Sequence, residues 1–171
     1  MATVNVDLNG FEEFFGSLER AASGQFREDM EIFLDGIGNE FLRIVQEEIV
    51  SRKVIDTRQL LTSFHKDAEG NVWELDEGGM TLYVGSSVEY AKYVNDGHWT
   101  NPKGVATRFV PGEWEGDRFI YDPNAEGGML LKQKWVQGAH YFDAALRAMN
   151  AMMPGLCEAK LKRWIDTHLP Q

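Results

Sequence analysis

Side chains that could do chemistry are sparse and poorly grouped in this sequence. The histidines stand far apart, at positions 65, 98, 140 and 168, and none has the spacing of a close metal-ligand pair. His98 follows Asp96 and could in principle serve a metal or acid–base site, but a solvent-facing loop histidine is the favoured interpretation. The histidines therefore indicate no catalytic centre.

The other reactive groups lead to the same expectation. Cys157 has no His or Lys arranged to activate it, which predicts a buried structural thiol. The methionines at 149, 152 and 153 recur at helical spacing and predict packing, not a soft-metal site. Carboxylates are paired at 12–13, 47–48, 76–77 and 113–117, where solvated faces and turns explain them. No phosphate-binding loop or nucleophile elbow occurs, so we expect no enzyme activity and no cofactor.

Length and charge narrow the class of protein further. The chain has 171 residues, 43% of them hydrophobic, which fits one folded domain over residues 1–171. Its net charge of −10 disfavours binding to nucleic acid or to an anionic membrane surface. A single cysteine rules out an internal disulfide and favours a reducing compartment. No secretory signal or apolar run long enough for a membrane span is visible.

Three segments have the apolar spacing of helices. Residues 11–22 predict a short amphipathic helix, and residues 26–50 predict a long one. Gly36 and Gly38 weaken the long helix, and they either permit close approach of another helix or mark a bend. Residues 139–169 predict a third helix, which Pro154 should kink or divide.

The middle of the chain predicts strands and short helical turns. Asp56 or Thr57 should cap a short turn, and residues 72–75 and 81–84 predict a β-hairpin. Ser86 or Ser87 should cap a helix over 88–95 that ends at Gly97. The segment at about 99–138 predicts a β-excursion or flap, with strands at 109–110 and 119–121 around a Pro111-Gly112 turn. The fold class is α+β: a small antiparallel sheet packed by a long N-terminal helix and a C-terminal helix kinked near Pro154.

Three segments, over residues 56–64, 84–97 and 140–146, together resemble a tail-component family of long-tailed bacteriophages. Residues 56–64 read DTRQLLTSF, similar to the family pattern DTG-x-L-x-x-S followed by an apolar residue. Residues 84–97 read VGSSVEYAKYVNDG, similar to the signature VGS-x-VEYA-x-YVE-x-G. Residues 140–146, HYFDAAL, resemble the family's C-terminal element. The departures are Arg58 where the family prefers Gly, His140-Tyr141 in place of Pro, and a longer connection over 99–138.

The resemblance implies a set of motif or interface residues. They are Asp56, Leu60, Ser63, Phe64, Gly85, Ser86, Val88, Tyr90, Ala91, Tyr93, Val94, Gly97, Phe142 and Leu146. Packing of a helix onto the sheet is the expected role of Ala91 and Val94. The two tyrosines lie three apart in a helix and could instead anchor a subunit interface, since each has an apolar body and a polar tip.

The resemblance also implies a function. A protein of this family is expected to be a non-enzymatic virion component of the neck or tail that completes the tail and joins it to the head. It should act as a homo-oligomeric ring subunit around the DNA channel, beside a connector, tail terminator or tail tube. Its location would be the virion, and the host cytoplasm during assembly.

Two other classes of function remain open at this point. The net charge of −10 would also suit an acidic protein that mimics nucleic acid and inhibits a DNA-binding enzyme. A hydrolase using His98 and nearby carboxylates would need a cleft that holds a metal or substrate.

Overall fold

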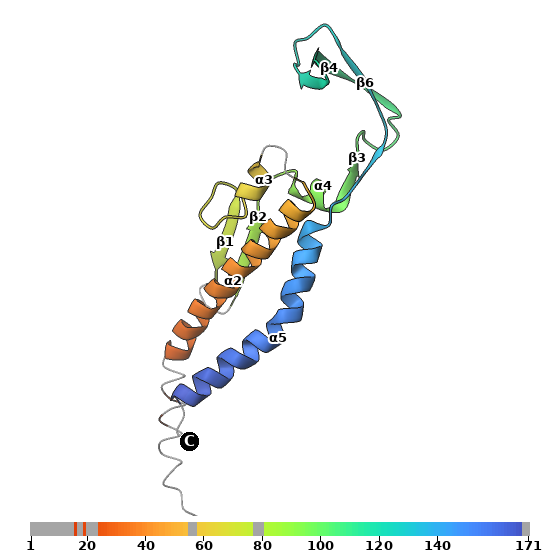
Figure 1. The fold of residues 1–171 in the computed structure, drawn as a ribbon. Helices are drawn as coiled ribbons and strands as arrows, with labels where there is room; N and C mark the ends of the chain where they lie inside the picture. Colours follow the sequence, from red (N-terminus) through yellow and green to blue (C-terminus); the bar gives the residue numbers. More distant parts are fainter. Residues whose placement is uncertain (1–15, 17–18, 20–23, 55–57, 77–80, 169–171) are drawn as a thin grey trace, which may run out of the picture. The chain divides into compact units, whose positions relative to one another are not determined.

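The computed structural model describes residues 16, 19, 24–54, 58–76 and 81–168, which belong to two compact units (Figure 1). Unit 1 comprises Met1–Val88 and Tyr141–Gln171, and unit 2 comprises Glu89–His140. The second unit is thus inserted, in sequence, between the two parts of the first. The helix expected over 11–22 lies almost wholly outside the described residues.

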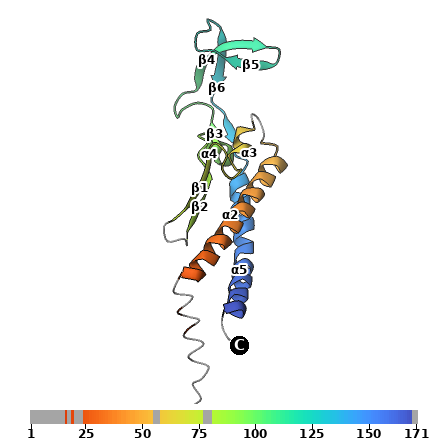
Figure 2. The same ribbon diagram turned by 90° about the vertical axis from the view of Figure 1, so that its left-hand side faces the viewer.

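Two long helices form the body of unit 1. Helix α2, Phe26–Ser51, confirms the predicted long helix, and α5 covers Tyr141–His168 with Pro154 inside it. The two helices lie side by side, and α5 changes direction about halfway along its length, where Pro154 lies (Figures 1 and 2). A proline removes one helical hydrogen bond and crowds the preceding turn, which explains the bend.

The side chain of Trp164 joins the C-terminal end of α5 to the N-terminal end of α2. The indole Nε1 of Trp164 donates a hydrogen bond to Oδ2 of Asp29 at 3.0 Å. The ring of Trp164 meets the edge of Phe26, with centroids 5.1 Å apart, and stacks on His168 at 4.7 Å. Trp164 is buried, so this contact extends the apolar core to the end of α5.

A β-hairpin covers one side of α2. Strands β1, Asn71–Leu75, and β2, Leu82–Ser86, pair antiparallel with Trp73 opposite Val84, as the sequence predicts. The hairpin contacts α2 at Gly38, where an added Cβ would lie 2.6 Å from the Trp73 ring and 2.6 Å from a Leu82 methyl. Gly38 therefore permits close approach of the hairpin, not of another helix.

Unit 2 is built mainly of antiparallel strands. Helix α4, Ala91–Asp96, leads into β3, Gly97–Trp99, which pairs with β7, Trp135–Gln137. Between them, β4, Thr107–Glu115, is the central strand of a three-stranded sheet, with β5, Arg118–Tyr121, and β6, Gly128–Lys132, at its edges (Figure 2). The expected β-excursion is therefore present.

The turn predicted at Pro111-Gly112 is wrong. Strand β4 runs through both residues and changes partner there, because Pro111 pairs with Gly128 of β6 and Gly112 pairs with Tyr121 of β5. Gly112 has φ 152°, and an added Cβ would lie 2.2 Å from the carbonyl oxygen of Ile120. Only glycine fits such a crowded position. The Pro-Gly pair, although typical of turns, therefore lies within a strand, at the point where the pairing partner of β4 changes. The turn lies between β4 and β5 instead.

The start of α4 also differs from the prediction. The helix begins at Ala91 with Tyr90 in the N-cap position, and no side chain caps it. Neither Ser86 nor Ser87 is the cap; instead, Oγ of Ser86 accepts a hydrogen bond from the Val88 amide at 3.1 Å, which closes a turn one step earlier. Gly97 ends the helix with φ 83°, as expected.

The architecture is α+β, with a long N-terminal helix, small antiparallel sheets and a bent C-terminal helix, as the sequence predicts. Among the described residues, no helix is both long and apolar enough to cross a membrane.

Candidate interaction site

The first family-like segment is part of the core of unit 1. Helix α3, Gln59–Thr62, follows Arg58, whose φ of 64° places it in the left-handed region. That conformation costs glycine little and other residues more, so the glycine that the family pattern has at this position would adopt it with less strain than arginine. Leu60 is buried, and Phe64 is fully buried. Asp56 and Thr57, the expected caps, lie outside the described residues.

A pair of hydroxyl groups, one of them buried, joins this segment to the start of the second one. The Oγ atoms of Ser63 and Ser86 are 2.7 Å apart, and Ser63 Oγ also donates to the Leu60 carbonyl at 2.8 Å. The side-chain amide of Asn71 donates to the carbonyls of Ser63, at 3.0 Å, and Gly85, at 3.3 Å. Ser63 is completely buried, so this network fixes α3 on the end of the hairpin.

The third segment completes the same core. The Phe64 ring lies 6.0 Å from that of Tyr141 and 6.2 Å from that of Phe142, between centroids. Phe142 in turn meets the edge of Phe41 of α2 at 5.4 Å. Leu146, one turn later, is exposed. Phe142 therefore packs the core, whereas Leu146 is available to a partner.

The rest of the signature begins unit 2. Tyr90, Ala91 and Val94 are half-buried, while Tyr93 is exposed and meets the edge of the His98 ring at 5.7 Å. An added Cβ at Gly97 would lie 2.6 Å from the carbonyl oxygen of Val136. The glycine therefore lets the strands that enter and leave the excursion lie in close contact. Of the large apolar signature residues in this unit, Tyr93 is the one that is exposed and so available to a partner.

An exposed apolar surface on the three-stranded sheet was missed by the sequence reasoning. Four large side chains stand out: Phe109 is 55% exposed and Leu130 70%, while Trp114 is 58% and Tyr121 63%. Phe109 and Leu130 face each other across β4 and β6, and Trp114 contacts Phe119 of β5 with centroids 5.3 Å apart. The signal was the density of aromatic residues in a segment otherwise rich in Gly and Pro.

The two faces of this sheet can be assigned from the pairing. Phe109 and Leu130 lie on one face, and Trp114 and Tyr121 lie on the other, because alternate residues of a strand point to opposite faces. Within unit 2, α4 packs beside β3 and not on this sheet. Exposed apolar side chains on both faces of a small sheet are typical of a surface that a partner covers.

The groups considered for catalysis do not form a site in the described part of the chain. Nδ1 of His98 lies 3.5 Å from the Tyr93 carbonyl, and within the described ranges no three His, Cys, Asp or Glu side chains converge as a metal site would require. Cys157 is exposed, so the prediction of a buried thiol is wrong: the residue falls on the solvent face of α5 beyond Pro154. Met149 is buried and packs the core, but Met152 is exposed.

A charge cluster on α2 stands on exposed helix surface. Arg43 bonds to Glu40 with its Nη2 2.5 Å from Oε1, and it also pairs with Glu47. The hydrogen bond from Arg43 lowers the pKa of Glu40, and the same carboxylate raises the pKa of Arg43. These are helix-surface pairs with spacing that stabilises α2, and they imply no catalysis.

Known proteins resemble this chain over most of its length. The family model described as "Bacteriophage HK97-gp10, putative tail-component" matches residues 12–97. The chain is 44% identical over 158 residues to the phage-like element PBSX protein XkdI of Bacillus subtilis (strain 168), covering 92% of this chain and 97% of that protein.

A second relative from the same organism, the uncharacterized protein YqbI, is 44% identical over 161 residues, covering 92% of this chain and 96% of that protein. No solved structure is significantly similar to the chain. The chain therefore belongs to the HK97-gp10-like family of phage tail components.

Proposed function

We propose that this tail component acts at the neck of the particle, where it completes the tail and joins it to the head as a non-enzymatic subunit of a ring around the DNA channel. The family supports a structural role in the tail. The proposal adds two features to this structural role: a position at the neck, and assembly of the subunits into a ring. Connector, tail terminator and tail tube proteins are the partners that such a position would require.

One observation carries the assembly part of this proposal. The sheet of β4, β5 and β6 exposes apolar residues on both faces, and its two outer strands are edges. When such a sheet binds a neighbour, its exposed apolar surface is removed from water. This removal stabilises the complex by about 25 cal/mol for each Å² covered, before the entropy costs of binding are subtracted. A ring subunit has a neighbour on each side and so can cover both faces.

The net charge favours a channel wall along which DNA slides, and it disfavours a surface that binds DNA. At −10, the chain repels phosphate groups overall. The acidic side chains Glu47, Asp67 and Glu74 are exposed on unit 1. If such residues line the channel, DNA passes without adhering to the wall. A ring with a basic lumen would contradict this part of the proposal.

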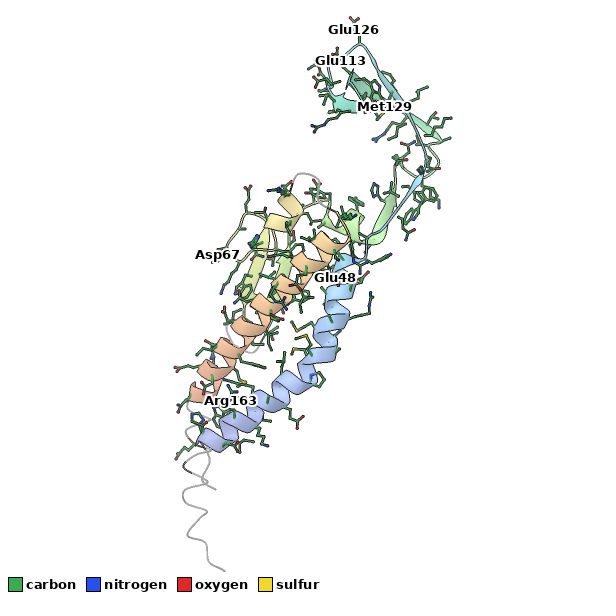
Figure 3. The ribbon with its side chains drawn as sticks, viewed as in Figure 1. Glu48, Asp67, Glu113, Glu126, Met129 and Arg163 are labelled. Carbon is green, nitrogen blue, oxygen red and sulfur yellow. The ribbon has the colours of Figure 1, made fainter. Side chains whose placement is uncertain are left out.

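Removal of the gene from the phage genome tests the proposed position. We expect DNA-filled heads and finished tails to accumulate separately in electron micrographs. Adding the purified chain to the extract should restore joined particles. Complete particles in the absence of the chain would refute the neck role, and an absence of tails altogether would indicate a part in tail-tube assembly instead. An Arg163→Ala chain serves as a matched protein control, because its side chain is exposed on unit 1 (Figure 3) and it should restore joining.

A further inference from the structure

Charged side chains are sorted along the three-stranded sheet of unit 2. At one end lie four exposed basic residues, here called the basic end: Lys103, Arg108, Lys132 and Lys134. The sequence has no Asp or Glu over 99–110 or over 130–137. Register places this end where β4 begins, since Thr107 pairs with Lys132.

The opposite end carries the opposite charge. Its exposed acidic residues, here called the acidic end, are Glu113, Glu115, Asp117, Asp122 and Glu126, with Arg118 as their one basic neighbour. Glu113 and Glu126 lie together at the far end of unit 2, beyond Met129 (Figure 3). Register places Glu115 and Arg118 opposite each other where β4 ends, while Asp122, whose amide donates to the Pro111 carbonyl at 3.3 Å, lies beside the middle of β4.

These charges are not neutralised inside the unit. Within the described part of the chain, none of the side chains of the two ends forms a salt bridge, whereas the ion pairs that do form lie in unit 1. Arg108 and Glu115 are seven residues apart on β4, which is about 23 Å at a strand rise of about 3.3 Å. That distance exceeds the Debye length of about 8 Å at physiological ionic strength, so each end presents its own field to solvent.

The exposed apolar residues lie along the same sheet. Lys132 lies two residues from Leu130 on β6 and therefore shares the face of Leu130 and Phe109. Glu113 and Glu115 lie on the same face of β4, four and six residues after Phe109. An apolar centre with charged residues at its rim is the usual composition of a protein interface. A partner that covers this sheet must therefore offer acidic groups to one end and basic groups to the other.

A second copy of this chain meets both requirements. We propose that the acidic end of one copy binds the basic end of the next, with the apolar side chains of the two sheets covered between them. This head-to-tail contact uses two different surfaces of each subunit, and such contacts form a ring when the rotation between neighbours closes on itself. The inference rests on the proposed ring and identifies the surface that forms it.

Charge reversal tests the contact in the full chain. Lys132→Glu combined with Lys134→Glu brings the formal charge of the basic end from +4 to 0, and Glu113→Lys combined with Glu115→Lys brings that of the acidic end, Arg118 included, from −4 to 0. Each double variant thus removes the charge attraction that one end offers to the next copy, so self-association should weaken at least about tenfold. Sedimentation velocity over a concentration series measures this effect.

A mixture of the two double variants gives the sharpest outcome. Each variant alone should sediment as a monomer, while the mixture should form pairs of one copy of each, since each variant keeps the end that the other lacks. Lys162→Glu with Arg163→Glu is the matched control for the Lys132 and Lys134 variant, because it lowers the net charge by the same amount at exposed positions of α5 and should leave association unchanged. Circular dichroism confirms that all three variants are folded.

Cross-linking covers the case of weak association. Unlabelled and ¹⁵N-labelled wild-type chains are mixed and treated with a carbodiimide, which joins Lys to Asp or Glu only at direct contact. We expect mixed-isotope links between lysines of the basic end and carboxylates of the acidic end. A wild-type chain that gives no such link would overturn the inference.

The test separates this inference from the neck role. If the wild-type chain assembles and the reversed variants assemble equally well, the contact assigned here is wrong, even where particles lacking the chain still fail to join heads to tails. If the mixture behaves as expected while particles form without the chain, the contact stands and the neck role fails.

Discussion

Two glycines of α2, two residues apart, should respond in opposite ways to the same substitution. Gly36 is exposed, and an added Cβ would meet nothing within 4 Å. Gly38 is buried, and an added Cβ would lie 2.6 Å from both Trp73 and Leu82 of the hairpin. Alanine at either position gains the same helix propensity, about 1 kcal/mol over glycine.

The crowding at Gly38 can therefore be measured as the difference in unfolding free energy between the two alanine variants. Gly36→Ala should raise the free energy of unfolding by about 1 kcal/mol, the full propensity term. Gly38→Ala gains this term but must displace the Trp73 ring from a contact far inside the usual carbon separation of about 3.5–4.0 Å, and overpacking costs about 1–3 kcal/mol. We expect Gly38→Ala to be about 1–3 kcal/mol less stable than Gly36→Ala.

Urea unfolding followed by circular dichroism at 222 nm measures the difference. The propensity term cancels between the two variants, so the midpoint difference reports the crowding alone, provided that the slopes agree. In a chain of this length, 1 kcal/mol also corresponds to about 2–4 °C in the melting temperature. Equal stabilisation by the two alanines would refute the contact between the hairpin and Gly38.

Three further substitutions follow from contacts within unit 1. Trp164→Phe removes the indole N–H that reaches α2 and should cost about 1–3 kcal/mol in urea unfolding, whereas an unchanged midpoint would show that the bond is not made in solution. Ser63→Ala leaves the Ser86 hydroxyl without its buried partner and should cost about 1–3 kcal/mol, with loss of amide-exchange protection in α3 as a second readout. The pKa of Glu40 is lowered by its hydrogen bond to Arg43, so the stabilisation is present above the ordinary value of 4.5 and is lost as the pH falls through the folded pKa. Arg43→Ala should therefore lose stability at neutral pH and match the wild type in acid, and a pH-independent difference would contradict this assignment.

Local apolar spacing was enough to predict the regular elements. The helix over residues 26–50, the hairpin around Trp73 and Leu82, and the bend at Pro154 all follow from periodicity and backbone chemistry that act over a few residues.

Features that depend on distant residues could not be predicted in this way. Pro111-Gly112 looks like a turn until the two partners of β4 are known, because the glycine is required by the carbonyl of Ile120 on another strand. The solvent exposure of Cys157 depends on which side of α5 faces α2. The charge sorting in unit 2 appears only when register places Arg108 and Glu115 at opposite ends of one sheet.

The motif residues divide for the same reason. Leu60, Ser63 and Phe64 are buried and hold unit 1 together, which accounts for a defined sequence pattern without any binding role. Tyr93 and Leu146 are exposed, so among the motif residues they are the ones through which we expect a partner to be recognised. The larger apolar surface lies outside the motifs, on the sheet of unit 2.

Cryo-electron microscopy of particles that carry a tagged copy of this chain tests the proposed position most directly. The account predicts a closed ring of copies at the junction between head and tail, with unit 2 of each copy in contact with its neighbour. Density for the chain along the tail tube, at the tail tip, or as isolated copies that do not touch one another would contradict it.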